Sequence, residues 1–425
     1  MKYCDVCGAN LLPGARFCTQ CGNPVAEVRL ARRRRWWIWV VGAVATVAAA
    51  VGVYWFGVKG SEELLLVTGD AGGNVSVWRA QDGKRLWTGQ HELWVWEVAF
   101  SPDGQLVASG SKDHTVRVWR AQDGQLLWTG RHKDIVGSVA FSPDGQLVAS
   151  GSKDHTVRVW RAQDGQRLWT GQHEDWVLTV AFSPDGQLVA SGSFDETVRV
   201  WRAQDGLLLW TGQHEGGVES VAFSPDGQLV ASGSFDATVR VWRAQDGQLV
   251  WRGQHEGAMW GMLSVAFSPD GQLVASGSDD HTVRVWRAQD GQILWTGQHE
   301  AWVWEVAFSP DGQLVASGSF DETVRVWRAQ DGQLLWRGLH EGGVWSVAFS
   351  PDGQLVASGS DDNTVRVWRA KDGQLVWRGQ HEDRVESVAF SPGRAAGGRG
   401  LFRPHGAGVA GPRRQASLGQ MMPRR

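Results

Sequence analysis

A unit of 41 residues recurs along most of this 425-residue chain, and this repetition constrains the fold more than any other feature. Each copy carries a Val-Trp-Arg run, and successive runs are 41 residues apart at every step except one of 44. The tryptophans of these runs are Trp78, Trp119, Trp160, Trp201, Trp242, Trp286, Trp327 and Trp368. Repeats of this length cannot bury their apolar faces alone, so they must stack against one another.

Each unit predicts four short strands. Residues 95–100 alternate in polarity and lead into a Ser-Pro-Asp-Gly turn at 101–104. Residues 106–110, 115–119 and 126–128 form the next three strands, separated by turns rich in Asp and Gly. Four short strands in a unit of about 40 residues predict one blade of an all-β propeller.

The two ends of the repeat region complement each other. Seven units are complete, between residues 95 and 379. The region opens with the last three strands of a unit, at 64–89, and ends with a first strand alone, at 384–390. We expect this last strand to complete the first blade, because closure removes exposed sheet edges. The prediction is therefore eight blades, and a seven-bladed ring with one loose unit is the alternative.

Each unit resembles the WD-repeat family. The Gly-His signature of that family is present with one residue inserted, as Gly-Gln-His ending at His91, and its Trp-Asp dipeptide is present as Trp119 followed by Arg. In the family a His, a Ser or Thr, an Asp and the Trp of the third strand form a buried, hydrogen-bonded tetrad. The resemblance assigns this role to His91, Ser109, Asp113 and Trp119, and to the matching residues of the other blades.

A Ser, a His and an Asp in each unit would also compose a hydrolase triad. A catalytic triad occurs once and needs an oxyanion hole, whereas this set recurs seven times. No phosphate-binding glycine loop or paired-carboxylate cleft stands out from the repeat. We therefore expect the set to be structural and the protein not to be an enzyme.

The repeats differ mainly at one end of each blade. The turns Ser-Pro-Asp-Gly-Gln and Ala-Gln-Asp-Gly hardly vary, whereas the start of the first strand and the turn between the second and third strands do. Antiparallel geometry brings the variable segments to one face, here called the variable face, and the constant turns to the other. Large aromatic residues there are typical contact anchors. We predict that a protein partner binds Trp94, Trp96, Lys112, His114, Trp176, Phe194, Phe235, Trp260, Trp302, Trp304, Phe320 and Trp345.

Two alternatives stay open for these residues. The aromatic side chains would instead pack between blades, and Trp96, which alternates with Val95, would point into the channel. Neutral drift in a low-complexity expansion is the other alternative, although drift should not spare one face. The three extra residues of the long repeat, within 257–263, also fall on the variable face.

All four cysteines lie in residues 1–24, as two CxxC pairs: Cys4 with Cys7, and Cys18 with Cys21. Each pair is followed by glycine, which permits a tight turn, and the two pairs suit one tetrahedral zinc site. The segment resembles the small zinc-ribbon family, which implies zinc as a cofactor. A redox CxxC is the alternative, but it occurs once and beside a βαβ pattern that is absent here.

Residues 36–58 are uncharged and apolar, and they follow a basic segment at 25–35. As a helix they would reach about 35 Å, enough to span a bilayer. The preceding arginines predict a cytoplasmic N-terminus and a propeller, residues 61–391, on the other side. A short linker of at most about 17 Å would turn the constant face toward the membrane. A cleaved signal peptide is the alternative, although a preceding metal site does not fit one.

Residues 392–425 depart from the repeat and contain seven basic residues and no acidic one. One base inserted after the proline codon of a further repeat, with suitable synonymous codons, reproduces this sequence through Gln415. We predict a frameshifted, disordered remnant of a ninth repeat. A functional basic tail is the alternative.

The repeat region, residues 61–391, carries 27 basic against 43 acidic residues, which argues against nucleic acid as a partner. The sequence therefore predicts a single-pass membrane protein whose propeller is an interaction scaffold or sensor. A propeller that binds glycan or cell wall is the second hypothesis, because exposed tryptophans also suit sugar faces. An enzyme is the third.

Overall fold

The computed structural model describes residues 2–3, 10–11, 63–256 and 264–393. The expected membrane helix at 36–58, the four cysteines, Trp260 and most of the tail lie outside the described residues. No helix in the described part of the chain is long and apolar enough to cross a membrane.

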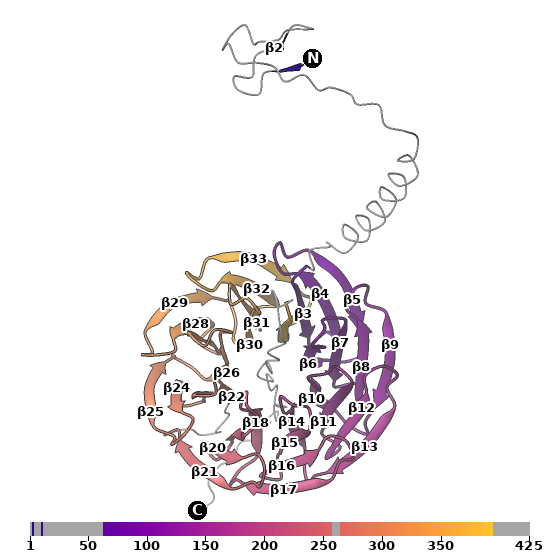
Figure 1. Cartoon of the computed structure of the whole chain (residues 1–425), viewed down its shortest axis with the longest axis vertical. Coiled ribbons are helices and arrows are strands. Elements are labelled where there is room, and N and C mark those ends of the chain that lie inside the picture. The colour runs from indigo at the N-terminus through magenta and orange to yellow at the C-terminus, as the bar shows by residue number, and fades with distance from the viewer. Residues whose placement is uncertain (1, 4–9, 12–62, 257–263, 394–425) are drawn as a thin grey trace, which may run out of the picture. The chain divides into compact units, whose positions relative to one another are not determined.

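The chain divides into two units, Met1–Ser61 and Glu62–Arg425. In the first unit, β1 (Lys2–Tyr3) and β2 (Asn10–Leu11) form an antiparallel pair. The second unit holds eight four-stranded antiparallel sheets arranged as blades around a central channel (Figure 1). The predicted all-β, eight-bladed propeller is confirmed.

Each complete blade follows the predicted strand order from the channel outward. The first complete blade is β6 (Val95–Phe100), β7 (Leu106–Ser111), β8 (Thr115–Arg120) and β9 (Leu126–Arg131). The next three blades are β10 (Val136–Phe141), β11 (Leu147–Ser152), β12 (Thr156–Arg161), β13 (Arg167–Gln172); β14 (Val177–Phe182), β15 (Leu188–Ser193), β16 (Thr197–Arg202), β17 (Leu208–Gln213); and β18 (Val218–Phe223), β19 (Leu229–Ser234), β20 (Thr238–Arg243), β21 (Leu249–Gln254).

The remaining complete blades repeat the pattern. They are β22 (Ser264–Phe267), β23 (Leu273–Gly277), β24 (Thr282–Arg287), β25 (Ile293–Gln298); β26 (Val303–Phe308), β27 (Leu314–Ser319), β28 (Thr323–Arg328), β29 (Leu334–Leu339); and β30 (Val344–Phe349), β31 (Leu355–Ser360), β32 (Thr364–Arg369), β33 (Leu375–Gln380). Strand β22 follows residues 257–263, which include the three extra residues and lie outside the described part of the chain.

The closing blade joins the two ends of the repeat region. It consists of β34 (Val385–Phe390), β3 (Leu65–Asp70), β4 (Asn74–Arg79) and β5 (Arg85–Gln90). Strands β34 and β3 pair antiparallel, with Leu66 opposite Phe390. The predicted closure is confirmed, and the seven-bladed alternative is wrong.

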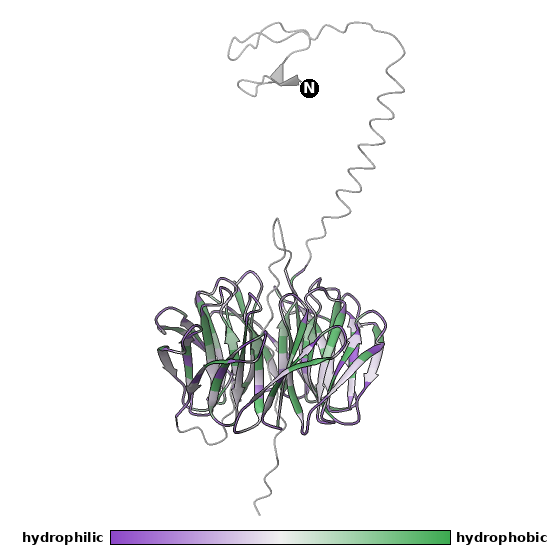
Figure 2. Ribbon diagram, turned by 60° about the horizontal axis from the view of Figure 1, so that its bottom comes forward, coloured by the Kyte–Doolittle hydropathy of each residue, from purple (hydrophilic) through white to green (hydrophobic). Residues whose placement is uncertain are grey.

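The apolar core lies between neighbouring blades. One cluster combines Val157 and Trp169 of one blade with Val180, Phe182 and Trp201 of the next, and all are buried. The middle strands are therefore covered on both faces, which explains their continuous runs of valine and alanine. Apolar residues gather within the blades and hydrophilic ones at the turns (Figure 2).

A second tryptophan in each blade ties it to the next one. On β5, the indole Nε1–H of Trp87 donates a hydrogen bond to the carbonyl oxygen of Ala121 in the following blade, at 2.7 Å. The equivalent bond across the closing blade, from Trp377 to Ala80, is also 2.7 Å. Gly124 lies over the Trp87 ring with a φ of 73°, and a Cβ there would come within 2.6 Å of the ring. These contacts account for the constant Ala-Gln-Asp-Gly turn.

The turn between the second and third strands requires a left-handed backbone conformation. In the closing blade glycine occupies the position, as Gly73 with a φ of 87°. In the other seven blades a residue other than glycine is held at a φ between 61° and 69°. These residues are His114, His155, Glu196, Ala237, His281, Glu322 and Asn363. L-residues are strained in this conformation, so the variable face is built at a local energetic cost.

We expect Ala237→Gly to stabilise the propeller by about 0.5–1 kcal/mol, because glycine relieves the strain at a φ of 61° and this gain exceeds its entropic cost. Differential scanning calorimetry measures the change. Ala203→Gly is the control, since Ala203 does not have a positive φ and the change should destabilise the protein. A lower melting temperature for both variants would contradict the assignment of strain.

Candidate functional site

The residues of the expected tetrad meet in a buried hydrogen-bonded chain. The Nε1–H of Trp119 donates to Ser109 Oγ at 2.9 Å, and the hydroxyl of Ser109 lies 2.7 Å from His91 Nε2. His91 Nδ1 lies 2.9 Å from Asp113 Oδ2. If His91 carries its proton on Nδ1, the Ser109 hydroxyl donates to His91 Nε2 and His91 Nδ1–H donates to Asp113. The closing blade builds the same chain from Trp78, Thr68, His381 and Asp70, with threonine in place of serine.

The protonation states of the tetrad suit a structural role. Burial lowers the pKa of His91, although Asp113 opposes the shift, so the imidazole stays neutral. Burial raises the pKa of Asp113, but hydrogen bonds from His91, Thr115 and the backbone N–H of Glu92 outweigh it and hold the pKa well below its usual range. Ser109 is fully buried, so its hydroxyl is out of reach of a substrate. This serine therefore does not serve as the nucleophile of a hydrolase triad.

A ring of polar side chains around the channel was missed by the sequence analysis. On the first strand of each blade, one residue is always Glu, Ser or Thr, and at seven of the eight steps a described backbone N–H of the next blade donates to it. The bonds run from Val98 to Ser387 (3.3 Å), Val139 to Glu97 (2.8 Å), Val180 to Ser138 (3.1 Å), Val265 to Ser220 (3.2 Å), Val306 to Ser264 (3.3 Å), Val347 to Glu305 (2.7 Å) and Val388 to Ser346 (3.1 Å). The signal was the constant polarity of this position, directly before Val-Ala-Phe.

Two members of this ring are glutamic acids in a fully buried setting. Burial raises the pKa of Glu97 to about 8, against the opposing hydrogen bond from the N–H of Val139. Burial raises the pKa of Glu305 to about 8 as well. The charge of Glu305 further raises the pKa of Glu97. Both carboxyl groups are therefore largely protonated at neutral pH.

The folded protein binds these two protons more tightly than the unfolded chain, whose glutamates titrate near 4.5. Their contribution to stability is therefore full below pH 4.5 and is lost as the pH rises through about 8. We expect a Glu97→Gln, Glu305→Gln protein to melt about 2–5 °C above the wild type near pH 9 and much closer to it near pH 5. Circular dichroism melting curves measure this difference. Exposed Glu92→Gln is the control, and an equal offset of the double variant at both pH values would refute the linkage.

The predicted contact residues of two neighbouring blades touch one another at the variable end of the channel. Trp304 and Trp345 lie 4.5 Å apart between ring centroids, and Phe320 packs against both, at 5.4 and 5.0 Å. Trp302 adds an edge contact with Phe320 at 5.9 Å. Trp304 and Trp345 are buried, whereas Trp302 and Phe320 are half-buried. The contacts thus support the expectation that the variable columns converge, and also the alternative that some of these rings pack between blades.

A second group of predicted residues carries cations on its indole rings. The ammonium nitrogen of Lys112 lies 4.0 Å from the ring centroid of half-buried Trp94, which also contacts buried Trp96. The guanidinium of Arg384 lies 4.7 Å from Trp94 and 5.1 Å from Trp345, so it joins this group to the first one. His114 is exposed at the strained turn.

The third group lies on the next blades around the ring. Lys153 Nζ lies 3.8 Å from the centroid of Trp176, which contacts Phe194 at 5.5 Å. Phe194 stacks on Phe235 at 5.2 Å. These three rings are half-buried, so part of each is available to a partner.

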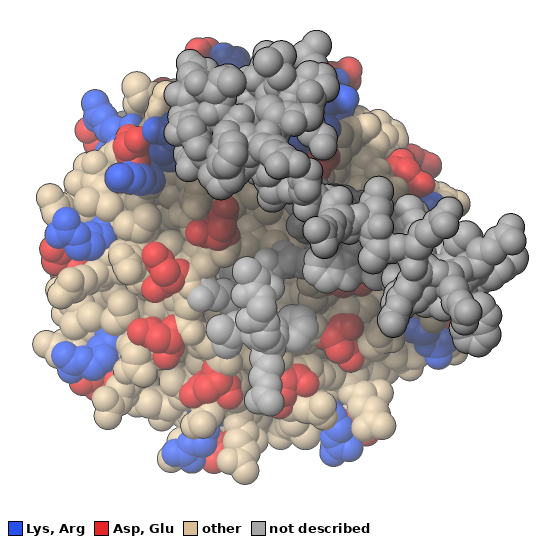
Figure 3. Space-filling model, turned by 45° about the horizontal axis from the view of Figure 1, so that its top comes forward, with Lys and Arg blue, Asp and Glu red and all other residues tan. Residues whose placement is uncertain are grey.

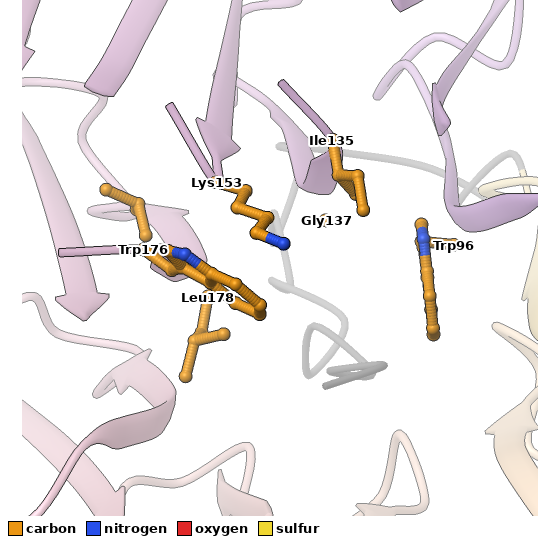
Figure 4. A pocket seen from close by; sticks show the side chains of 7 residues that line it. Trp96, Ile135, Gly137, Lys153, Trp176 and Leu178 are labelled. Atoms are coloured by element: carbon orange, nitrogen blue, oxygen red, sulfur yellow. The ribbon is translucent and has the colours of Figure 1, made fainter. Parts of the chain in front are cut away.

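A shallow apolar hollow opens beside this third group (Figure 4). It is lined by Trp96, Ile135, Gly137, Lys153, Trp176, Val177 and Leu178. Trp96 stands across the hollow from Lys153 and Trp176 (Figure 4).

On the rest of the propeller surface, many basic side chains pair with acidic ones. On the face shown in Figure 3, basic side chains gather near the rim beside acidic ones, and acidic side chains stand alone closer to the centre. The turns between the third and fourth strands supply such pairs, as between Arg120 Nη1 and Asp123 Oδ2 at 2.9 Å. Each of these arginines is thus balanced by a carboxylate.

The predicted zinc ligands Cys4, Cys7, Cys18 and Cys21 lie outside the described residues. The short hairpin of β1 and β2 flanks the first CxxC pair, with Tyr3 opposite Asn10. No group of three or more His, Cys, Asp and Glu residues in the described ranges is placed to hold a metal ion.

Comparisons with known proteins agree with this architecture. The family model described as WD domain, G-beta repeat matches seven segments: residues 83–120, 124–161, 165–202, 207–243, 250–287, 291–328 and 337–369. A zinc-ribbon domain model matches residues 3–25. The crystal structure of the computationally designed Ika8 protein is similar, with a TM-score of 0.62 and 32% identity, over 74% of this chain and 94% of that chain. The search of curated proteins finds no match.

Proposed function

Because the chain belongs to the WD-repeat family, we propose that its propeller is a non-enzymatic interaction scaffold or sensor that binds a partner protein through the variable face. The observation that carries the proposal is the convergence of Trp94, Trp176, Trp302 and their neighbours at one end of the channel. Half-buried aromatic rings and cations that lie on a rigid frame are typical anchors of protein interfaces.

A glycan-binding propeller is the second candidate. Sugar recognition by tryptophan uses the open face of the ring. The faces of Trp94 and Trp176 are instead covered by Lys112 and Lys153, at 4.0 and 3.8 Å. This arrangement favours a protein partner over a sugar.

The N-terminal part of the chain extends the proposal. The apolar residues 36–58 would anchor the scaffold in a membrane by one helix, with the N-terminus in the cytoplasm and the propeller outside. The zinc-ribbon match and the hairpin beside the first CxxC pair support a zinc-binding module at residues 1–24. Thiolate ligands suit a reducing compartment, which agrees with a cytoplasmic N-terminus.

Capture from carbonate-washed membranes tests the scaffold. Full-length protein is crosslinked to its neighbours and purified, beside a variant in which Trp94, Trp176, Trp302 and Trp345 are changed to Ala. We expect a protein bound by the wild type to be lost, by about tenfold or more, from the variant. A matched variant with Gln105→Ala and Gln146→Ala on the constant turns should retain it. Equal capture by all three proteins would reject the variable face as the site.

Zinc release tests the N-terminal module. We expect about one zinc per chain in the purified full-length protein, and its loss in a Cys4→Ser, Cys18→Ser variant, because a four-thiolate site does not persist with two ligands. Metal analysis and a colorimetric chelator measure both quantities. A metal content that is unchanged in the variant would contradict the assigned ligands.

A further inference from the structure

The hollow beside Lys153 exists because one blade lacks a side chain that the other blades have. Gly137 occupies a column of the first strands that otherwise holds Trp96, Leu178, Glu219, Trp304, Trp345 and Glu386 among the described residues. A Cβ added to Gly137 would meet only the carbonyl oxygen of Leu178, at 4.0 Å. Gly137 has no positive φ, so its backbone does not require glycine. The hollow is therefore open at the point where the other blades place a side chain.

The walls of the hollow are apolar, and its polar groups are donors. Ile135, Val177 and Leu178 form the apolar lining. Trp96 is only 4% exposed, yet its Nε1–H has no hydrogen-bond partner among the described residues. A buried donor without a partner is costly, so a ligand that accepts its hydrogen bond gains affinity. Lys153 supplies a second donor, and a positive charge, from the other side (Figure 4).

The charge of Lys153 is not balanced within the described part of the propeller. Neither Lys112 nor Lys153 forms an ion pair with a described residue, in contrast to Arg384, which has Glu386 Oε1 at 2.5 Å. Acidic residues in the turns before the two first strands are engaged with the backbone: the Oδ1 atoms of Asp134 and Asp175 each accept the N–H of the following residue, at 2.8 Å. An anionic group from a partner would therefore meet uncompensated positive charge here.

We propose that this hollow receives one large apolar side chain, aromatic or of leucine size, from a segment of the partner protein that places an acidic residue beside it. The apolar side chain takes the place that Trp96 and Trp345 fill in their own blades. The carboxylate of the acidic residue reaches Lys153, and an oxygen of the segment accepts the indole N–H of Trp96. This inference rests on the proposed function and specifies which side chains the partner segment must carry.

Selection of displayed peptides tests the inference. Random peptides are selected on full-length protein in lipid nanodiscs, and the enriched peptides are then measured by calorimetry. We expect enriched sequences to place Asp or Glu within about two residues of Trp, Phe or Leu, in keeping with an apolar anchor next to a charge partner. Enrichment of basic peptides, or of peptides without a large apolar residue, would overturn the proposal.

Single substitutions locate the binding at the hollow. Gly137→Trp should weaken the selected peptides by about tenfold or more, because it fills the space, whereas Gly137→Ala should change affinity by less than about threefold. Lys153→Gln should weaken binding about three- to tenfold and reduce its salt dependence. Exposed Lys133→Gln, on the same blade but outside the hollow, is the matched control. Circular dichroism melting curves verify that each variant is folded.

The outcomes separate this inference from the proposed function. If binding survives Gly137→Trp but is lost when Trp302 and Trp345 are changed to Ala, the variable face binds a partner and the hollow is not its site. If no peptide is enriched and no protein is captured, both proposals fail.

Discussion

Hydrogen bonds that pass from each blade to the next hold the ring together, and the rest of the structure depends on them. At the outer radius the indole of a tryptophan such as Trp87 donates to a carbonyl of the following blade. At the channel a Glu or Ser side chain accepts a backbone N–H of the following blade, as Glu97 does from Val139. Seven of the eight joints are thus fixed at two radii, which prevents a blade from tilting against its neighbour. Within a blade, the buried chain from Trp119 to Asp113 fixes the two turns of the variable face.

This division of labour explains which parts of the repeat are constant. The Ala-Gln-Asp-Gly turn cannot change freely, because Ala121 accepts the indole bond and Gly124 must lie against the ring of Trp87. The outer tryptophans donate no such bond to the start of the first strand in the described residues. Side chains as different as Trp96, Gly137 and Glu219 therefore occur in one column. The hydrogen bonds between blades do not constrain the side chains of the variable face. Eight blades with similar backbones can therefore present eight different surfaces.

The sequence predicted the fold closely but the site only in outline. Period and turn chemistry predicted the first three strands of the unit to within one residue, but ended the fourth strand, β9, three residues too early. The complementary half-blades predicted the pairing of β34 with β3. The polar ring of Glu97 and Ser138 was overlooked, because its role depends on the N–H of a neighbouring blade, 42 residues away. The hollow at Gly137 was likewise beyond the sequence: the glycine is visible there, but whether its space is filled depends on Leu178, Trp176 and Lys153. Burial also could not be read from the sequence, because the predicted contact residues include both buried Trp345 and exposed His114.

The closing strand raises a question of timing during synthesis. Thr68 and His381, which meet in the closing blade, are 313 residues apart, so β3 emerges from the ribosome long before its partner. Several first strands of nearly the same sequence are synthesised before β34. Strand β18 even has the same six residues as β34, Val-Glu-Ser-Val-Ala-Phe. Local sequence therefore does not select the strand that closes the ring. The selection must come from curvature, because a ring closed at β18 would contain too few blades to keep the joints at both radii. The geometry of one repeated joint between blades therefore sets the number of blades. A chain that gained or lost one repeat would keep the contacts between successive blades, and only the pairing of its first and last strands would fit less well.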